Sequence, residues 1–222
     1  SLGSGLHILV GFAVAIILFE GGMNLRISRI MRERNAIRGL ITIGALCTLI
    51  GGTLITIIFL GWDFRTSILF GTLIIVTGPT VITPLLKRIR VHHGVSTILE
   101  AEGILLDAIG AIIAVVALEI AISPSGLSFV KGFYHIISRL AIGGILGVTG
   151  GFLLTVLFRF RTLIPNGLEN VFILSWVIAL FQISNTISPE SGIAAVTIAG
   201  MTIGNSKTYI QQDLLEFKEQ LT

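Results

Sequence analysis

Long apolar stretches separated by short polar segments run along the whole chain. Each apolar stretch is about 20 residues long, which is enough to cross a hydrocarbon core about 30 Å thick as a helix. We therefore expect an all-α fold, a polytopic helical membrane protein. The pattern predicts seven transmembrane spans, at residues 5–25, 39–60, 67–86, 95–122, 133–158, 168–185 and 189–205.

The connection 26–38, with the sequence RISRIMRERNAIR, holds five arginines and one glutamate. Its apolar residues Ile27, Ile30 and Met31 recur at helical spacing, which favours a short amphipathic segment along the membrane surface. Residues 206–222 are polar and amphipathic and predict no eighth span. We expect both ends of the chain to be truncated, so that residues 1–222 form part of a larger transmembrane domain.

The composition excludes a soluble domain, because 53% of the residues are hydrophobic and only 12% are charged, against about 25% charged residues in soluble proteins. The opening stretch lacks the basic start and cleavage pattern of a signal peptide and runs on through Glu20. The single cysteine, Cys47, excludes a disulfide within the chain. His92 and His93 lie in a basic loop, where we expect solvated side chains; a pH-sensing role is the alternative.

The net charge of +3 and the pI of 9.4 do not indicate nucleic acid as a partner, because basic residues in membrane proteins mostly set topology. If the loop 26–38 is cytoplasmic, the seven spans leave Arg65, Lys131 and Arg139 on the outer side, and we expect all basic residues in loops or near span ends. The cytoplasmic side then holds 12 of the 15 lysines and arginines: Arg26, Arg29, Arg32, Arg34, Arg38, Lys87, Arg88, Arg90, Arg159, Arg161, Lys207 and Lys218. This asymmetry agrees with the positive-inside rule.

The segment TGPTVITPLL, residues 77–86, ends the third predicted span with a glycine and two prolines. Pro79 lacks an N–H and obstructs the carbonyl of Ile75, and the second proline does the same to Thr80. Gly78 allows the turn ahead of the first proline. Irregular backbone at membrane depth persists only where it is buried in protein or lines a cavity, so we expect a broken helix at the bilayer centre. A proline kink whose carbonyls are satisfied by neighbouring helices is the alternative.

The fourth predicted span carries an acid at its centre. Asp107 lies in a 16-residue stretch, 103–118, that is otherwise uncharged. A carboxylate there costs roughly 2.5–3.5 kcal/mol, and such residues by default mark ion or proton pathways. Glu102 lies towards the cytoplasmic end, and Glu100 shares the face of Asp107. Together with the broken helix at the same depth, Asp107 predicts a cation site; a structural ion pair with a basic residue is the alternative.

At these motifs the sequence resembles the monovalent cation:proton antiporters of the sodium/proton exchanger type. LFEGGMNL (18–25) is similar to an early helix end of that family, and TGPTVITPLL to its broken helix, usually written Thr-Asp-Pro. EGILLDAIGA (102–111) is similar to the ion-binding helix, usually Glu-Ser-Leu-Leu-Asn-Asp, and SGIAAVTIAGMTIGN (191–205) to a later helix. The resemblance covers nearly the whole chain.

The resemblance implies that Asp107 is the ion- and proton-binding carboxylate, that Glu102 helps to hold the site, and that Thr77 contributes oxygen ligands. Two residues depart from the family pattern: Gly78 replaces an aspartate, and Leu106 replaces an asparagine or aspartate. The resemblance further implies a transporter and not an enzyme, a homodimer in a prokaryotic inner or plasma membrane, and no cofactor beside the transported Na+ or K+ and H+.

Three other functions fit parts of this pattern. An intramembrane aspartyl protease needs two facing aspartates, and only Asp107 lies at depth. A non-transporting membrane subunit leaves the burial cost of Asp107 unexplained. A passive cation channel remains an alternative function, since it would differ from an antiporter only in lacking proton coupling.

Glycines in the apolar stretches are expected to permit close helix packing: Gly44, Gly51, Gly52, Gly143, Gly144, Gly147, Gly150 and Gly151.

Overall fold

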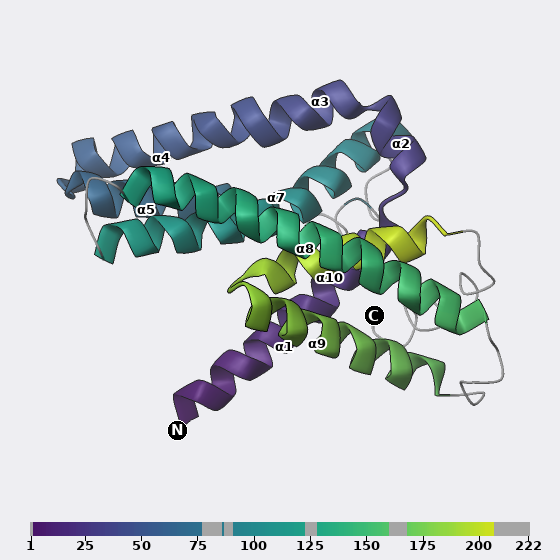
Figure 1. The fold of residues 1–222 in the computed structure, drawn as a ribbon. Coiled ribbons are helices and arrows are strands. Elements are labelled where there is room, and N and C mark those ends of the chain that lie inside the picture. The colour runs from purple at the N-terminus through teal and green to yellow at the C-terminus, as the bar shows by residue number, and fades with distance from the viewer. Residues whose placement is uncertain (1, 77–85, 87–90, 123–127, 160–167, 207–222) are drawn as a thin grey trace. The chain divides into compact units, whose positions relative to one another are not determined.

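The computed structural model describes residues 2–76, 86, 91–122, 128–159 and 168–206, and every regular element within these ranges is a helix (Figure 1). The predicted all-α fold is therefore confirmed. The helices are α1 (Leu2–Asn24), α2 (Ile27–Arg32), α3 (Arg34–Gly39), the π-helical turn η1 (Leu40–Gly44), α4 (Ala45–Leu60), α5 (Phe64–Ile75), α7 (His93–Ile122), α8 (Ser128–Arg159), α9 (Glu169–Ile187) and α10 (Ser191–Gly204).

Each predicted span overlaps a helix, although α5 covers the third predicted span only as far as Ile75, and residues 77–85 lie outside the described residues. Four helical stretches are long and apolar enough to cross a membrane: Arg34–Leu60, His93–Ile122, Tyr134–Arg159 and Glu169–Ile187. Three shorter apolar helices, Leu9–Asn24, Phe64–Ile75 and Ser191–Gly204, fall on the other predicted spans. The second span begins earlier than predicted, because α3, η1 and α4 form one continuous helical stretch.

The helices form two compact units. The first unit comprises Ser1–Ile27 and Ala141–Thr222, and the second comprises Ser28–Leu140. The first unit therefore holds α1, α9, α10 and most of α8. The second holds α3, η1, α4, α5, α7, the start of α8 and nearly all of α2.

Helix α10 lies at the centre of the first unit and packs against α1 through glycines. A Cβ on Gly22 of α1 would meet the carbonyl oxygen of Thr197, and one on Gly200 of α10 would meet that of Phe19. Gly204 lies against the backbone of Met23 in the same way. Because the backbones touch directly at these points, dispersion contacts hold the two helices together without any ion pair.

Helix α8 approaches the opposite side of α10 through Gly143, Gly147 and Gly151, one turn apart. An ideal Cβ on Gly147 would lie 2.5 Å from the carbonyl oxygen of Ala195. The prediction of close packing is confirmed for these three glycines and for Gly150 and Gly52, which have similarly tight neighbours. It is wrong for Gly51, which has open space around it, and for Gly44 and Gly144, which have only ordinary contacts.

Polar side chains fix the two ends of α10. At its start, the hydroxyls of Ser184 and Ser191 lie 2.8 Å apart and are fully buried. At its end, the Asn205 side chain accepts a hydrogen bond from the Ile27 N–H at 2.8 Å and donates one to the Leu25 carbonyl at 2.8 Å. The amide thus ties the end of α10 to the backbone that follows α1.

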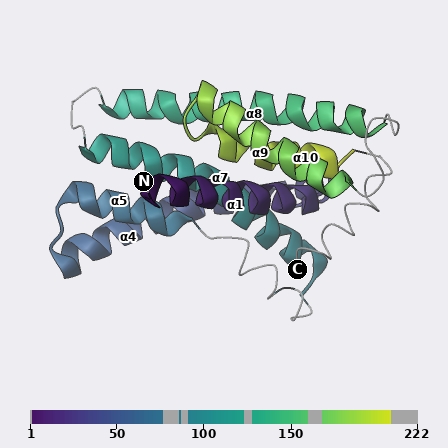
Figure 2. The same cartoon turned by 90° about the horizontal axis from the view of Figure 1, so that it is seen from below.

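In the second unit, α4 and α5 form a helical hairpin whose two arms lie side by side (Figures 1 and 2). Gly61 ends α4 in the left-handed conformation with φ +64°, which glycine adopts without strain. Asp63 then caps α5 by accepting hydrogen bonds from the Thr66 hydroxyl and from the Thr66 and Arg65 N–H groups. These bonds, the Thr66 hydroxyl first, hold the pKa of Asp63 below its usual value, so the cap is lost only as pH falls through that lowered pKa.

A pair of alanine substitutions on α8 tests the close contact with α10. We expect Gly147→Ala to destabilise the full-length protein by about 1–3 kcal/mol, because the backbone of α10 must move to admit the methyl group. Gly144→Ala is the matched control, since its Cβ would meet only Ile198 at 3.6 Å, and alanine favours a helix over glycine. Thermal unfolding in detergent measures both, and equal midpoints would contradict the packing described here.

Candidate cation-binding site

Helix α7 carries Asp107 at its middle. The carboxylate lies fourteen residues after His93 and fifteen before Ile122 in a helix of 30 residues. At a rise of 1.5 Å per residue, each end is about 21 Å away, which exceeds half of a hydrocarbon core about 30 Å thick. Asp107 thus lies at the middle of a helix long enough to span a membrane, and its place at the bilayer centre stays a prediction.

The part of α7 that carries Asp107 is apolar and largely buried. Its chain neighbours Leu106 and Ala108 are 4% and 5% exposed, and Ile104 is 3% exposed, while Asp107 itself is partly buried. Among the described residues, none forms a hydrogen bond or ion pair with the Asp107 carboxylate. The alternative of a structural ion pair therefore finds no partner in this part of the chain.

Helix α5 ends where the sequence predicts the helix to break. Its last residue is Ile75, which is 5% exposed, and Val76 adopts extended backbone with φ −71° and ψ 108°. Five of the predicted site and broken-helix positions follow directly: Thr77, Gly78, Pro79, Thr80 and Pro84. They lie outside the described residues, so their roles stay predictions.

The end of α5 meets α7 beside Asp107. An ideal Cβ on Gly110 would lie 2.9 Å from Cγ2 of Val76 and 3.8 Å from Cγ2 of Ile75. The Val76 side chain therefore packs directly against α7 at position 110, where a larger residue would force it to move. Because Gly110 follows Asp107 by three residues, both lie on one face of α7. The described residues therefore bring the end of the third span to within one helical turn of the acid.

Two further acids lie on the cytoplasmic half of α7. Glu102 precedes Asp107 by five residues, about 7.5 Å of helix rise, and the charges of the two carboxylates repel one another. Glu102 has an interaction partner of its own. Glu100 accepts a hydrogen bond from the Ser96 hydroxyl at 3.0 Å, so it belongs to a local contact nearer the start of the helix.

The second unit also contains an ion pair that the sequence analysis did not predict. Arg139 of α8 donates a hydrogen bond from Nη2 to Oε1 of Glu119 on α7 at 2.7 Å. The Arg139 side chain is 6% exposed and that of Glu119 is 48% exposed. Nη1 of Arg139 is buried and has no hydrogen-bond partner in the described part of the chain.

Arg139 lies five residues into the candidate span Tyr134–Arg159, so the expectation that every basic residue lies in a loop or near a span end holds for it, although its side chain is buried. Side chains tilt towards the start of their own helix, so Arg139 of α8 and Glu119 of α7 lean towards each other in this antiparallel pair. The signal was present in the sequence as opposite charges in two successive predicted helices. It was missed because Arg139 was counted with the charges of the outer loops.

An all-helical membrane fold in which a helix ends at mid-depth beside a lone acid is typical of secondary transporters. The chain belongs to the sodium/hydrogen exchanger family: the family model described as "Sodium/hydrogen exchanger, transmembrane" matches residues 2–221. The resemblance that the motifs indicate is therefore confirmed, and the protein is a multi-pass membrane protein of an antiporter family.

Two relatives illustrate the range of the family. The chain is 29% identical to the K(+)/H(+) antiporter NhaP2 of Shewanella oneidensis, over 97% of this chain and 38% of the relative. It is 26% identical to the Na(+)/H(+) antiporter NhaS2 of Synechocystis sp., over 99% of this chain and 41% of the relative. The chain thus spans about two fifths of the length of these relatives.

The fold is similar to that of the sodium proton antiporter MjNhaP1 from Methanocaldococcus jannaschii, whose structure was determined at pH 8. The TM-score is 0.70 at 24% identity, and the match covers 95% of this chain and 51% of the solved chain. At this identity the likeness concerns the fold.

The ion pair between α7 and α8 predicts unequal effects of its two partners. Glu119→Gln leaves the buried Arg139 without its counter-charge, and we expect a loss of about 3 kcal/mol. Arg139→Met removes the buried charge, and the remaining carboxylate of Glu119 is already half exposed. We therefore expect the free energy of unfolding to fall by less than about 1 kcal/mol. Thermal unfolding of the full-length protein in detergent measures both. A larger loss for Arg139→Met would show that the arginine is stabilised by other contacts.

Proposed function

We propose that the chain is part of a secondary active antiporter that exchanges a monovalent cation, Na+ or K+, for H+ at Asp107. The observation that carries the proposal is the acid itself: it lies at the middle of α7 without a partner among the described residues, one turn from the point where α5 ends. Membership of the sodium/hydrogen exchanger family supports the same reaction.

Competition for one carboxylate accounts for the coupling. Asp107 is neutral when it holds a proton and neutral when it holds a monovalent cation. Either loaded form can pass a low-dielectric barrier, whereas the empty anion pays a desolvation cost. Cation and proton therefore exclude each other at the site, and the protein moves one only in return for the other.

The remaining ligands are assigned by position. A single carboxylate cannot replace the hydration shell of a cation, so further oxygen atoms must come from nearby backbone and hydroxyl groups. The end of α5 supports this assignment, since Val76 leads from the packed contact at Gly110 into the segment that holds Thr77 and Thr80. Glu102 is assigned to holding the site by the resemblance to the family, and it precedes Asp107 by five residues on the same helix.

The proposal refers to the whole protein in its membrane. We propose that it works as a homodimer in a prokaryotic inner or plasma membrane, which agrees with the bacterial source of the two antiporter relatives. Because the chain spans about two fifths of these relatives, the tests below use the full-length protein.

Replacing the acid tests the site. We expect Asp107→Asn to abolish cation-driven proton movement in proteoliposomes, because an amide can hold neither a proton nor a cation in place of the carboxylate. Expression and thermal stability should persist, since removing an unpaired buried charge need not destabilise a fold. Asp63→Asn is the matched control: it makes the same chemical change at the exposed cap of α5 and should leave exchange unchanged.

The assay follows internal pH and cation content together, with Na+, K+ and Li+ supplied in turn. Wild-type exchange by Asp107→Asn would refute the site. Cation flux without any proton movement in the unmodified protein would instead identify a passive channel, the function that the sequence leaves open. Absence of flux for all three cations would favour a non-transporting subunit.

The number of acids predicts the stoichiometry. Position 106 is Leu and position 78 is Gly, so neither supplies a second titrating group beside Asp107. We therefore expect one cation to move per proton and no net charge to cross the membrane. Proteoliposomes on a solid-supported membrane should give no transport current when a cation gradient is applied, while a pH dye in the same liposomes reports exchange.

Glu102 is the group that can break this expectation. If it also loses a proton in each cycle, two protons move per cation, and the current has the sign of proton movement. A current that disappears in Glu102→Gln while dye-detected exchange persists would contradict one-for-one exchange and assign the second proton to this residue.

A further inference from the structure

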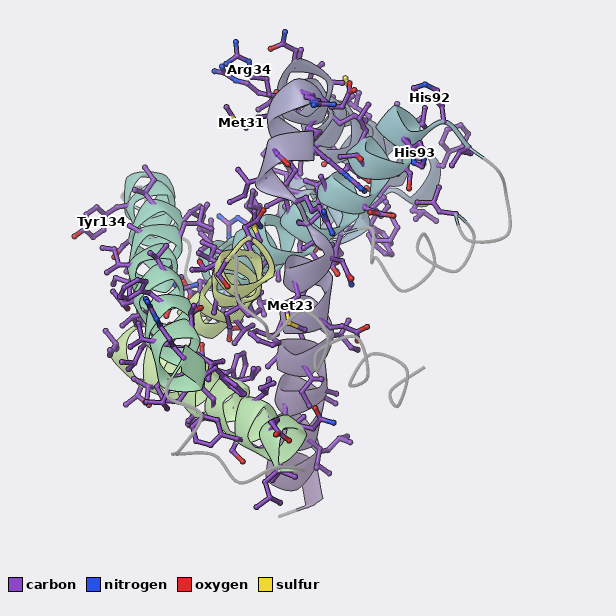
Figure 3. The ribbon with its side chains drawn as sticks, turned by 90° about the vertical axis from the view of Figure 1, so that its right-hand side faces the viewer. Met23, Met31, Arg34, His92, His93 and Tyr134 are labelled. Atoms are coloured by element: carbon purple, nitrogen blue, oxygen red, sulfur yellow. The ribbon has the colours of Figure 1, made fainter. Side chains whose placement is uncertain are left out.

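Four exposed arginines lie along α2 and α3, and an exposed methionine lies between them in the sequence. Arg29, Arg32, Arg34 and Arg38 are all exposed, and Met31 among them is 56% exposed. In Figure 3 the labelled side chains of Met31 and Arg34 project away from the ribbon. We call these five residues the basic surface.

The guanidinium groups of the basic surface have no anionic partner within the described residues. No hydrogen bond or ion pair of their side chains is found there. The one acid of the segment, Glu33, is turned towards α7, where its Oε1 would lie 3.1 Å from a Cβ on Gly94. Within ten residues of chain, four exposed positive charges therefore have no counter-charge from the described residues.

The buried side of α3 and the preceding Glu33 contact other parts of the second unit. Ile37 is 4% exposed and anchors α3, and Glu33 lies against the start of α7. Figure 1 shows α2 running across the axis of α3 and α4 and not along it. Because the stretch Arg34–Leu60 is long and apolar enough to span the membrane, a helix that crosses its axis at Arg34 lies along the membrane surface.

We propose that the basic surface binds the headgroups of anionic phospholipids in the leaflet that faces it, with Met31 inserted among the acyl chains. The geometry matches an interfacial helix, which places basic residues at the headgroups and an apolar side chain below them. Topology alone requires an excess of arginines on one side. It does not require that a segment with four exposed arginines also exposes an apolar side chain, Met31, on a different face of α2 from Arg29 and Arg32.

The strength of the interaction follows from the charge. A basic side chain near an anionic membrane surface contributes about fivefold to binding. Loss of three arginines should therefore weaken the preference for anionic lipid by more than tenfold, even where their effects overlap. The interaction is electrostatic, so rising salt should weaken it in detergent.

The experiment compares lipids on the purified full-length protein. Thermal unfolding in detergent is measured while phosphatidylglycerol or phosphatidylcholine is added. We expect phosphatidylglycerol to raise the unfolding temperature by several degrees more than phosphatidylcholine. The triple variant Arg29→Gln, Arg32→Gln, Arg34→Gln should lose at least half of this difference. The matched control Arg65→Gln, Arg159→Gln changes two exposed arginines elsewhere and should retain it.

A second measurement does not depend on removing charge. Tryptophan introduced by Met31→Trp should be quenched more strongly by brominated phosphatidylglycerol than by brominated phosphatidylcholine in mixed vesicles. Equal stabilisation and equal quenching by the two lipids would overturn the proposal. Full retention of the phosphatidylglycerol effect in the triple variant would also overturn it. Equal stabilisation by inorganic phosphate alone would overturn it as well, because it would indicate a site for a soluble anion.

Discussion

The structure depends on one constraint: inside a lipid bilayer, every backbone N–H and C=O must find a partner within the protein. Helices satisfy it along their length, and the described ranges are accordingly helical. The end of α5 is the exception, because Val76 leaves the helix in an extended conformation at the depth of Asp107. Such a break is tolerated only where protein packs around it, and Gly110 provides that contact by letting Val76 reach the backbone of α7.

The second unit contains a buried charge that is paired and an acid that has no partner among the described residues. Arg139 is buried, and its charge is balanced by Glu119 at 2.7 Å on the neighbouring helix. Asp107 has no such partner among the described residues. A paired charge is held in one state by its partner, whereas an unpaired carboxylate in apolar surroundings favours whichever neutral form a proton or a cation provides. This difference underlies the proposal that Asp107 exchanges its ion, whereas the bond between Glu119 and Arg139 joins the end of α7 to the start of α8.

Packing in the first unit rests on small residues. Glycines on α1, α8 and α10 bring three helices into backbone contact around α10, where side chains such as Ala195, Val196 and Ala199 are fully buried. In a membrane, lipid tails are as apolar as the helices, so burial of apolar surface gives little drive for association. Close approach and the bonds of Asn205 take its place.

The sequence by itself determined the all-α fold, the order of the apolar helices among the described residues, the acid at the middle of α7 and the end of α5 ahead of Pro79. These features are local: hydropathy over about 20 residues, one charge in an apolar run, and prolines that cannot continue a helix. Only the tertiary structure decided that Gly110 is the residue against which the broken helix packs, that Arg139 reaches Glu119, and that Asn205 binds the backbone at Ile27, 178 residues away. Each of these contacts depends on how two helices are rotated and staggered against each other, which is set by the fit of their side chains and not by the pattern of either helix alone.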